Sequence, residues 1–489
     1  MPNHFFDPLL LSTHGLMSAI GLLVYVLMSH ALRQRRHPAA AVGWVLLLLG
    51  APYVGLPLYL AFGARKQPRA RVGPPVVPLR VGGSAADASP DERRVEAAWA
   101  QWTGPLAASM GLPPRARYDS LGLHLAGDDA RAALWAVIDG AQRTLDVCTF
   151  LLGRDALGDA VCERLAARAA AGVKVRLLVD GIGLLMGGRR DLAGLAAQGV
   201  QVARFVPPLR SPLKGRLNLR NHRKMVIADG ERLWCGGRNL ADEYFGVAAL
   251  PSAGATGSRA VGHWRDLSFD LRGEAARMAA ALFEADWRFA TGRGIAAPPL
   301  RAPSTAPCRD ASVQLVPSGP DYAEDTLHAL LVTACFRAQR RILAVTPYLV
   351  PDEALMSALV LAARRGVMVE IVLPASSNHR LADLARRRPM RELAEAGAHL
   401  RLIDGMVHAK AMVFDDALAI AGSANLDARS LFLNYELMLA FDAPADVRRF
   451  SEAVEAIAAD ARDWLPKRTQ PGLPLRLAEG LVLWLAFQL

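Results

Sequence analysis

The 489-residue chain contains five cysteines, and no two of them have the C-x-x-C spacing of metal-binding and redox motifs. An odd and dispersed set of cysteines argues against a disulfide framework and against a zinc site. We interpret most of them as small buried hydrophobic side chains in a reducing compartment. We expect no metal and no cofactor. The positions are Cys148, Cys162, Cys235, Cys308 and Cys335.

Charged side chains are missing from two long stretches near the N-terminus, residues 8–32 and residues 37–64. Each stretch can hold the ~20 apolar residues that a helix needs to cross a bilayer. Pro52 and Pro57 are expected to kink the second helix or to make it re-entrant. We therefore predict a transmembrane helical hairpin over residues 1–66.

A cleaved signal peptide is the alternative interpretation of the first stretch, since Ser29-His30-Ala31 faintly resembles a cleavage site. Signal peptides begin with basic residues, but residues 1–7 contain no Lys or Arg, and the apolar stretch is long for cleavage. Three arginines in residues 33–36 compete with four basic residues in residues 65–71. The positive-inside rule therefore favours a cytoplasmic C-terminal domain by a small margin only.

The net charge is +11, which favours anionic partners such as phospholipid headgroups or nucleic acid. A solubilising surface charge would be the simpler explanation. The hydrophobic fraction of 52% is at the high end for a soluble protein. Because part of that excess lies at the N-terminus, a membrane is the more fitting partner.

One eight-residue pattern occurs twice, and each copy is followed at the same distance by a turn of small residues that ends in asparagine. A single octet in a chain of this length is a weak match, but two octets with matched turns indicate a duplicated half-site. The octets are His222-x-Lys224-x4-Asp229 and His408-x-Lys410-x4-Asp415. The turns are Gly236-Gly237-Arg238-Asn239 and Gly422-Ser423-Ala424-Asn425.

Each half also repeats a run of helix, strand, helix and strand, followed by a further helix and the strand that carries the motif. Strands that alternate with helices predict an α/β sheet, largely parallel, in each half. The first run covers 132–142, 144–150, 157–171, 173–179 and the helix 191–198. The second covers 326–338, 341–346, 353–365, 367–373 and the helix 389–396.

The predicted organisation has six parts. A half-domain of residues 121–295 and a second of residues 313–470 follow the hairpin. The remaining parts are a linker with an approach helix (67–120), a Pro- and Ala-rich linker (296–312) and an apolar C-terminal tail (471–489). The tail is too short to span a bilayer and is expected to pack on the core or lie at the interface.

The motif residues fit phosphorus chemistry. Side chains two apart in a strand face the same way, so His222 and Lys224 should share a face, as should His408 and Lys410. An imidazole can attack or carry a proton at neutral pH, and a lysine supplies positive charge for phosphate oxygens. A histidine beside a lysine at this spacing fits neither a metal cluster nor an acyl-transfer triad. Substrate-binding donors are expected from Asn239, Asn425 and Ser423.

Displacement of an alcohol from a phosphodiester needs a nucleophile and a proton donor on opposite sides. Two half-sites that face each other provide both, through a covalent phosphohistidine. A carboxylate should fix the tautomer of each imidazole, and each half offers one downstream of its histidine, Asp266 and Glu436. Asp229 and Asp415 complete the candidate catalytic set, although we expect them mainly to fix their turns.

These residues resemble the signature of the phospholipase D superfamily. Longer segments resemble bacterial cardiolipin synthases in particular, over nearly the whole chain. The resemblance implies two phospholipase D-like half-domains related by a pseudo-twofold axis, after a transmembrane helical hairpin. The segments are 221–224, 236–244, 264–266, 346–352, 422–436 and, in the hairpin, 35–40 and 52–55.

The family implies transfer of a phosphatidyl group from one phosphatidylglycerol to another, which gives cardiolipin and glycerol without a metal. It also implies His222 as nucleophile and His408 as acid. The implied location is the bacterial inner membrane, multi-pass, with an anionic phospholipid membrane and no nucleic acid as partner. The loop 246–262 is longer and richer in Gly and Ala than the family pattern, which leaves acceptor recognition open.

Several alternatives remain. A hydrolytic phospholipase D, or a transferase that uses phosphatidylethanolamine, would carry the same residues. A superfamily nuclease fits the basic charge but not the hairpin, and a scaffold with a dead site is opposed by two complete motifs. Excluding water favours transfer, and Tyr348, Phe150 and Tyr244 are candidates for an apolar entrance wall. The oligomeric state is unknown.

Overall fold

The computed structural model describes residues 8–31, 38–63, 65–66, 102–188, 190–207, 217–246, 264–292, 311–466, 472, 479–480 and 482. Several predicted features lie outside these ranges. They are the basic loop 33–36, most of the predicted approach helix before residue 102, residues 247–262 of the Gly- and Ala-rich loop, and most of the linker 296–312.

The predicted helices and strands of both halves are confirmed with small shifts at their ends, as expected for boundaries. The first half contains β1 (Ala116–His124), α5 (Gly127–Asp139), β2 (Thr144–Thr149), α6 (Ala156–Ala170), β3 (Lys174–Asp180), α7 (Gly181–Met186), α8 (Leu192–Ala197), β4 (Gln201–Phe205), β5 (Met225–Ala228), β6 (Arg232–Gly236), the 3₁₀ helix η2 (Asp242–Phe245), β7 (Ser268–Gly273) and α9 (Glu274–Thr291).

The second half repeats this order with a few short additions. It contains β8 (Ser312–Ser318), α10 (Thr326–Arg337), β9 (Arg341–Val345), β10 (Leu349–Val350), α11 (Glu353–Arg364), β11 (Met368–Pro374), α12 (Arg380–Ala385), α13 (Arg387–Glu395), β12 (His399–Ile403), β13 (Ala411–Phe414), β14 (Leu418–Gly422), β15 (Leu426–Asp427), α14 (Ala428–Phe432), β16 (Glu436–Phe441), α15 (Pro444–Ile457) and β17 (Arg462–Asp463).

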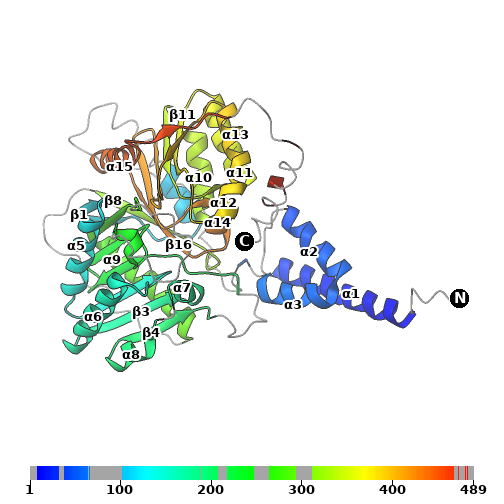
Figure 1. Ribbon diagram of the computed structural model, residues 1–489, viewed down its shortest axis with the longest axis horizontal. Helices are drawn as coiled ribbons and strands as arrows, with labels where there is room; N and C mark the ends of the chain where they lie inside the picture. Colours follow the sequence, from blue (N-terminus) through cyan, green and yellow to red (C-terminus); the bar gives the residue numbers. More distant parts are fainter. Residues whose placement is uncertain are drawn as a thin grey trace, which may run out of the picture.

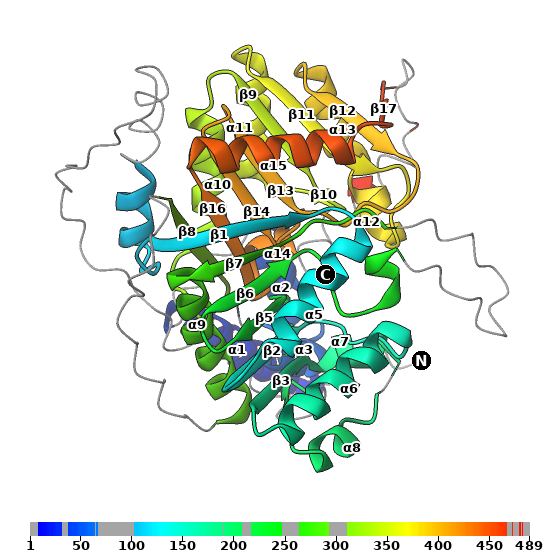
Figure 2. The ribbon, with the colours of Figure 1, turned by 90° about the vertical axis from the view of Figure 1, so that its left-hand side faces the viewer.

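Within the described residues, fifteen strands form one sheet, and its centre is the antiparallel pair of β1 and β8. On one side of that pair the order is β1-β7-β6-β5-β2-β3-β4. On the other side it is β8-β16-β14-β13-β9-β11-β12, with β17 at the edge. Counted outward from the central pair, each strand of the first half therefore has its equivalent at the same place in the second half (Figure 2). This arrangement bears out the two half-domains related by a pseudo-twofold axis.

The prediction of a largely parallel sheet is wrong. Within the described fifteen-stranded sheet, β2-β3-β4 and β9-β11-β12 pair in parallel, and the remaining neighbours within each half are antiparallel. The separate pair of β10 and β15 is also parallel. The parallel strands of the large sheet are those joined by helical crossovers, which such connections require. The strand after each motif histidine instead turns back through a short hairpin, β5 to β6 and β13 to β14, and this forces antiparallel pairing.

One hydrophobic core belongs to both halves. Phe283 and Trp287 of α9 and Phe450 of α15 pack with residues of strands from both halves, including Phe269 of β7 and Phe441 of β16. On the other face of the sheet each half has a core of its own, beneath α5 and α6 or beneath α10 and α11. Because apolar burial is the main stabilising term in folding, the shared core fixes the two halves in one register.

The N-terminal helices differ in part from the predicted hairpin (Figure 1). Among the described residues, one helix, at Ser12–His30 within α1 (Pro8–Ala31), is long and apolar enough to cross a membrane. The second apolar stretch is divided into α2 (Pro38–Gly50) and α3 (Pro52–Phe62). The predicted effect of Pro52 is confirmed, because it starts α3 after a break at Ala51. Each piece is shorter than the ~20 residues of a spanning helix.

The two short helices pack tightly on one another. A Cβ added at Gly55 would lie 2.9 Å from the backbone oxygen of Leu47, so only glycine allows this approach. Tyr59 is fully buried, with its ring centroid 5.1 Å from that of Trp44 and 5.4 Å from that of Tyr25. In contrast, many large apolar side chains of α1 are exposed, including Leu16, Leu23, Val26 and Leu27. Exposed apolar area of this kind fits association with a membrane.

Only four residues of the predicted C-terminal tail are described. The carboxylate of Glu479 is buried and pairs with Arg391 of α13, with Nη1 and Oε1 3.1 Å apart. Val482 lines a cavity between the two half-domains. These contacts agree with the prediction that the tail packs on the core.

Candidate active site

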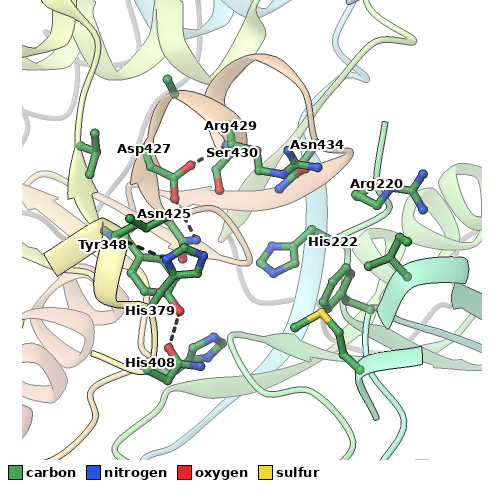
Figure 3. Close-up of a pocket in the computed structure, with 18 of the residues that line it drawn as sticks. Arg220, His222, Tyr348, His379, His408, Asn425, Asp427, Arg429, Ser430 and Asn434 are labelled. Atoms are coloured by element: carbon green, nitrogen blue, oxygen red, sulfur yellow. Dashed lines mark hydrogen bonds between the residues drawn. The ribbon is translucent and has the colours of Figure 1, made fainter. Parts of the chain in front are cut away.

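A cavity of about 420 Å³ lies between the two half-domains. It is lined by both motif histidines, His222 and His408, and by both turn asparagines, Asn239 and Asn425. Figure 3 shows the two imidazoles on different elements, facing the same space. The structure therefore brings together residues that lie almost two hundred positions apart in the chain, as the duplicated motif predicts.

The motif histidines do not lie in the strands where the sequence places them. Residues 222–224 precede β5, and residues 408–410 precede β13. In both places the backbone leaves its own half and pairs with the other. The amide of His222 donates to Tyr435 O at 2.9 Å, and the amide of His408 donates to Arg265 O at 2.7 Å. Each histidine is thus held by main-chain bonds from the opposite half-domain.

The orienting carboxylates are crossed in the same way. His222 Nδ1 lies 2.9 Å from Glu436 Oε1, and His408 Nδ1 lies 2.8 Å from Asp266 Oδ2. Both predicted carboxylates thus reach a motif histidine, but the pairing of each with the histidine of its own half is wrong. The reason is that β7 and β16 flank the central pair of strands, where the two halves meet. A carboxylate at Nδ1 directs the Nε2 atom of each ring toward the cavity.

Ser423 has a different position from the predicted one. It does not line the cavity but donates to Glu436 Oε2 at 2.5 Å, and Asn434 Nδ2 donates to Glu436 Oε1 at 3.2 Å. The equivalent residue of the first half is Gly237, where an added Cβ would collide with Asp266. The two half-sites therefore differ, since the carboxylate opposite His222 has a hydroxyl donor and the carboxylate opposite His408 has none at that position.

Both lysines are buried beside their histidines. Lys224 Nζ donates to His222 O at 2.7 Å, and Lys410 Nζ lies 2.7 Å from His408 Nδ1. Burial lowers the pKa of Lys224 to about 8 and that of Lys410 to about 7, although Glu436 and Asp266 oppose the shift. At neutral pH Lys224 is therefore mostly charged and Lys410 is partly charged. Because both are buried, their ammonium groups are poorly hydrated.

The imidazoles are neutral at neutral pH. Burial, followed by the charge of Lys410, lowers the pKa of His408 to about 3. Burial also lowers the pKa of His222. A neutral imidazole with its Nδ1–H on a carboxylate carries its lone pair on Nε2, which suits a nucleophile or a base.

The motif aspartates lie outside the cavity. Asp415 accepts bonds from the amides of Gln339, Arg340 and Arg341 at 2.7–2.9 Å. Asp229 does the same for residues 142–144. Both lie at hairpin turns with positive φ, which is 57° for Asp229 and 54° for Asp415. This confirms the expectation that they mainly fix their turns. They fasten the start of β2 and β9 to the strand that follows each histidine.

Several lining residues were missed. Arg220 and Arg429 stand at one side of the cavity, where Arg220 Nη1 lies 3.3 Å from Asp180 Oδ1 and Arg429 Nη1 donates to Asn218 at 2.9 Å. Arg220 directly precedes Asn221-His222, so its position in the sequence could have identified it as a candidate cavity residue. His379 is a third imidazole at the cavity, and no pattern in the sequence indicates it.

The predicted aromatic wall is present. Phe150, Tyr244 and Tyr348 all line the cavity. The ring centroid of Phe150 is 5.2 Å from that of His222, and the centroid of Tyr244 is 4.9 Å from that of His408. Among the residues that the structure describes, no group of three or more His, Cys, Asp or Glu side chains is arranged to hold a metal ion.

Comparison with known proteins agrees with this architecture. Residues 134–248 and 331–458 match the family described as "Cardiolipin synthase, PLD-like domain", and residues 19–63 match "Phospholipase_D-nuclease N-terminal". Cardiolipin synthase A of Pseudomonas entomophila is 32% identical over 473 residues, which cover 92% of this chain and 93% of that one. Cardiolipin synthase A of Klebsiella pneumoniae is 31% identical over 441 residues, covering 86% and 87%.

A solved structure has the same fold. The phosphatidylserine synthase of Haemophilus influenzae aligns with a TM-score of 0.56 over 82% of this chain and all of its own. The sequence identity is 13%, so this likeness concerns the fold alone.

The position of Asp415 predicts a loss of stability. Asp415→Ala removes a buried acceptor of three backbone amides and should lower the free energy of unfolding by roughly 2–4 kcal/mol. The adjacent Asp416→Ala removes a half-exposed ion pair with Arg341 and should change it by less than about 1 kcal/mol. Urea unfolding of the full chain in detergent measures both. Equal midpoints for the two variants would contradict the assigned role.

Proposed function

Since the chain belongs to the bacterial cardiolipin synthase family of the phospholipase D superfamily, we propose that it joins two phosphatidylglycerol molecules into cardiolipin and releases glycerol. It is then a phosphatidyltransferase. One observation carries the proposal: imidazoles from both halves face one cavity, each hydrogen-bonded to a carboxylate of the opposite half. That arrangement supplies one nucleophile and one proton carrier to a single phosphorus atom.

The first step forms a covalent intermediate. His222 Nε2 attacks the phosphorus of the first phosphatidylglycerol, and the bond between phosphorus and the headgroup glycerol oxygen breaks. His408 gives a proton to that oxygen, so glycerol leaves as a neutral alcohol and a phosphatidyl group stays on His222. Glu436 accepts the Nδ1–H of His222 and stabilises the positive ring.

The second step reverses the roles. A headgroup hydroxyl of the second phosphatidylglycerol attacks the same phosphorus, and His408, now neutral, accepts its proton. The bond between phosphorus and Nε2 breaks, which restores His222 and yields cardiolipin. One phosphodiester replaces another, so the release of glycerol into water drives the reaction forward.

The proton on His408 depends on the substrate. Burial and the adjacent Lys410 lower the pKa of His408 to about 3. A bound phosphodiester places a negative charge between the imidazoles and raises the proton affinity of His408. Lys224 and Lys410 balance that charge and the charge that develops on the phosphate oxygens.

Transfer must win over hydrolysis at the covalent intermediate. Phe150, Tyr244 and Tyr348 give the cavity aromatic walls that limit the access of water. A bilayer anchor raises the local concentration of the second lipid. We assign the chain to the bacterial inner membrane as a multi-pass protein with the catalytic part on the cytoplasmic side. Its partner is an anionic phospholipid membrane.

The reaction products test the proposal directly. With phosphatidylglycerol labelled in the glycerol headgroup as the only lipid, we expect labelled cardiolipin and free labelled glycerol in equal amounts. Because no metal takes part, the yield should persist in excess chelator. Thin-layer chromatography separates the products. Phosphatidic acid as the sole lipid product would mean a hydrolase, and loss of activity that zinc or magnesium restores would contradict the metal-free mechanism.

The roles of the two histidines can be distinguished by whether each variant still forms the covalent intermediate. His222→Ala and His408→Ala should each lower turnover by at least about 10³-fold. In His408→Ala, some labelled phosphatidyl group should remain on the denatured protein and be released by acid, as expected for a phosphohistidine. The exposed His399 lies outside the cavity, and His399→Ala is the control. Label retained by His222→Ala but not by His408→Ala would reverse the two assignments.

The lowered pKa values of the two lysines predict that activity falls at alkaline pH. Their pKa values are lowered, so each is charged below its pKa and loses its charge as pH rises, Lys410 through about 7 and Lys224 through about 8. The value of kcat/KM, which reports on the free enzyme, should therefore fall across that window. An arginine stays charged, so Lys410→Arg should move the decline to higher pH at a reduced rate. A flat profile from about pH 6 to about pH 9 would exclude a role for the lysine charge.

A further inference from the structure

Exposed apolar side chains border the cavity on both sides. On α7 of the first half, Met186 is 67% exposed and Leu185 is 44% exposed. On α12 of the second half, Leu381 is 46% exposed. Met186 and Leu381 also line the cavity. We name these three residues the rim. Large apolar side chains exposed around an opening mark a surface that meets another apolar phase.

Basic side chains accompany the rim. Arg380 is exposed next to Leu381 in α12, and Arg387 and Arg388 are exposed at the start of α13. Arg154 is exposed in the loop that contacts Gly188 just after α7. Apolar side chains together with arginine on short surface helices are typical of segments that lie in the headgroup region of an anionic bilayer. The charge complements phosphatidylglycerol, the lipid of the proposed reaction.

The N-terminal helices are attached to the catalytic part on the side that carries the rim. The amide of Leu217, five residues before His222, donates to Ala61 O of α3 at 3.1 Å. Lys66 is buried, and its Nζ lies 2.8 Å from Asp325 Oδ1 at the start of α10. The orientation of the catalytic part relative to α3 is therefore held by bonds on both halves.

Further contacts lead from this junction to the cavity. The guanidinium of Arg65 lies 4.8 Å from the ring centroid of Phe432 in α14. The same short helix supplies Arg429 and Ser430 to the cavity lining. In Figure 1, α7, α12 and α14 all lie on the side of the catalytic part that faces α1–α3. The rim and the helix able to cross a membrane thus share one side.

We propose that the rim on α7 and α12 is a membrane-contact surface, separate from the N-terminal helices, which inserts into the headgroup boundary of an anionic phospholipid bilayer. The opening of the cavity then meets the bilayer directly. Lipids enter and leave it without crossing water, which the proposed transfer between two lipids requires. The identity of the ligand rests on the proposed function, but contact of the rim with lipid can be measured without activity.

The chain offers a matched control. Leu361 on α11 is also 44% exposed and does not line the cavity. Leu185 and Leu361 are the same residue type on helices, with equal exposure. Leu185 adjoins Met186, which lines the cavity, whereas no residue of α11 does. Neither leucine lines the cavity, so substitutions there leave its walls intact.

Fluorescence quenching by lipid tests the surface. Leu185→Cys and Leu361→Cys, each carrying bimane, are placed as full chains in vesicles of phosphatidylglycerol and phosphatidylcholine that contain nitroxide-labelled lipid. The labelled parent chain gives the background, since Cys162 is partly exposed while Cys148, Cys235 and Cys335 are buried. We expect at least about twofold stronger quenching at position 185 than at position 361. Equal quenching, or none at position 185, overturns the proposal.

Activity gives a second readout. Leu185→Glu should lower kcat/KM on vesicles by about tenfold and have a smaller effect on short-chain phosphatidylglycerol dissolved as monomers, whereas Leu361→Glu should behave as the parent chain. An equal loss on both substrate forms would mean a damaged fold and would overturn the assignment. If the parent chain makes no cardiolipin, the proposed function fails, while the quenching result still decides whether the rim meets lipid.

Discussion

The candidate site depends on two hydrogen bonds that cross between the half-domains, from His222 to Glu436 and from His408 to Asp266. Neither half contains a complete imidazole–carboxylate pair. Both bonds depend on the relative position of the two halves. That position is fixed by the antiparallel pair of β1 and β8 and by the core beneath α9 and α15. A carboxylate positions an imidazole only within hydrogen-bond reach, so a small slip at this central seam would disturb both histidines at once.

Much of this was predictable from the sequence, and the failures have physical causes. Hydrophobic periodicity located the helices and strands, and the repeated octets with their turns identified the two histidines and the two asparagines that line the cavity. The crossing of the carboxylates was not predictable, because spacing along the chain does not say which strand ends meet across a symmetry axis. The hairpin turns at Asp229 and Asp415 look the same in sequence whether the flanking strands continue a parallel sheet or reverse. Ser423 was misplaced because a small polar residue in a turn can face a ligand or a carboxylate equally well.

Duplication did not produce two identical environments. His408 packs against Tyr244 and Trp264, with Lys410 beside its ring nitrogen. His222 lies against Phe150, and its carboxylate has a further donor in Ser423. Burial and the charges of Lys224 and Lys410 lower the pKa of both rings. The proposed reaction asks different tasks of the two rings, so this divergence in surroundings suits a division between nucleophile and proton carrier.

The crossed bonds also constrain how such a protein can evolve. In most duplicated chains each copy can drift, since a change in one copy leaves the other intact. Here the partner of each histidine is inherited with the opposite copy, as in a symmetric dimer whose subunits share their sites. A substitution at Asp266 or Glu436 is therefore felt in the other repeat. Selection acts on the repeats jointly, and neither can be exchanged for a distant homologue without its companion.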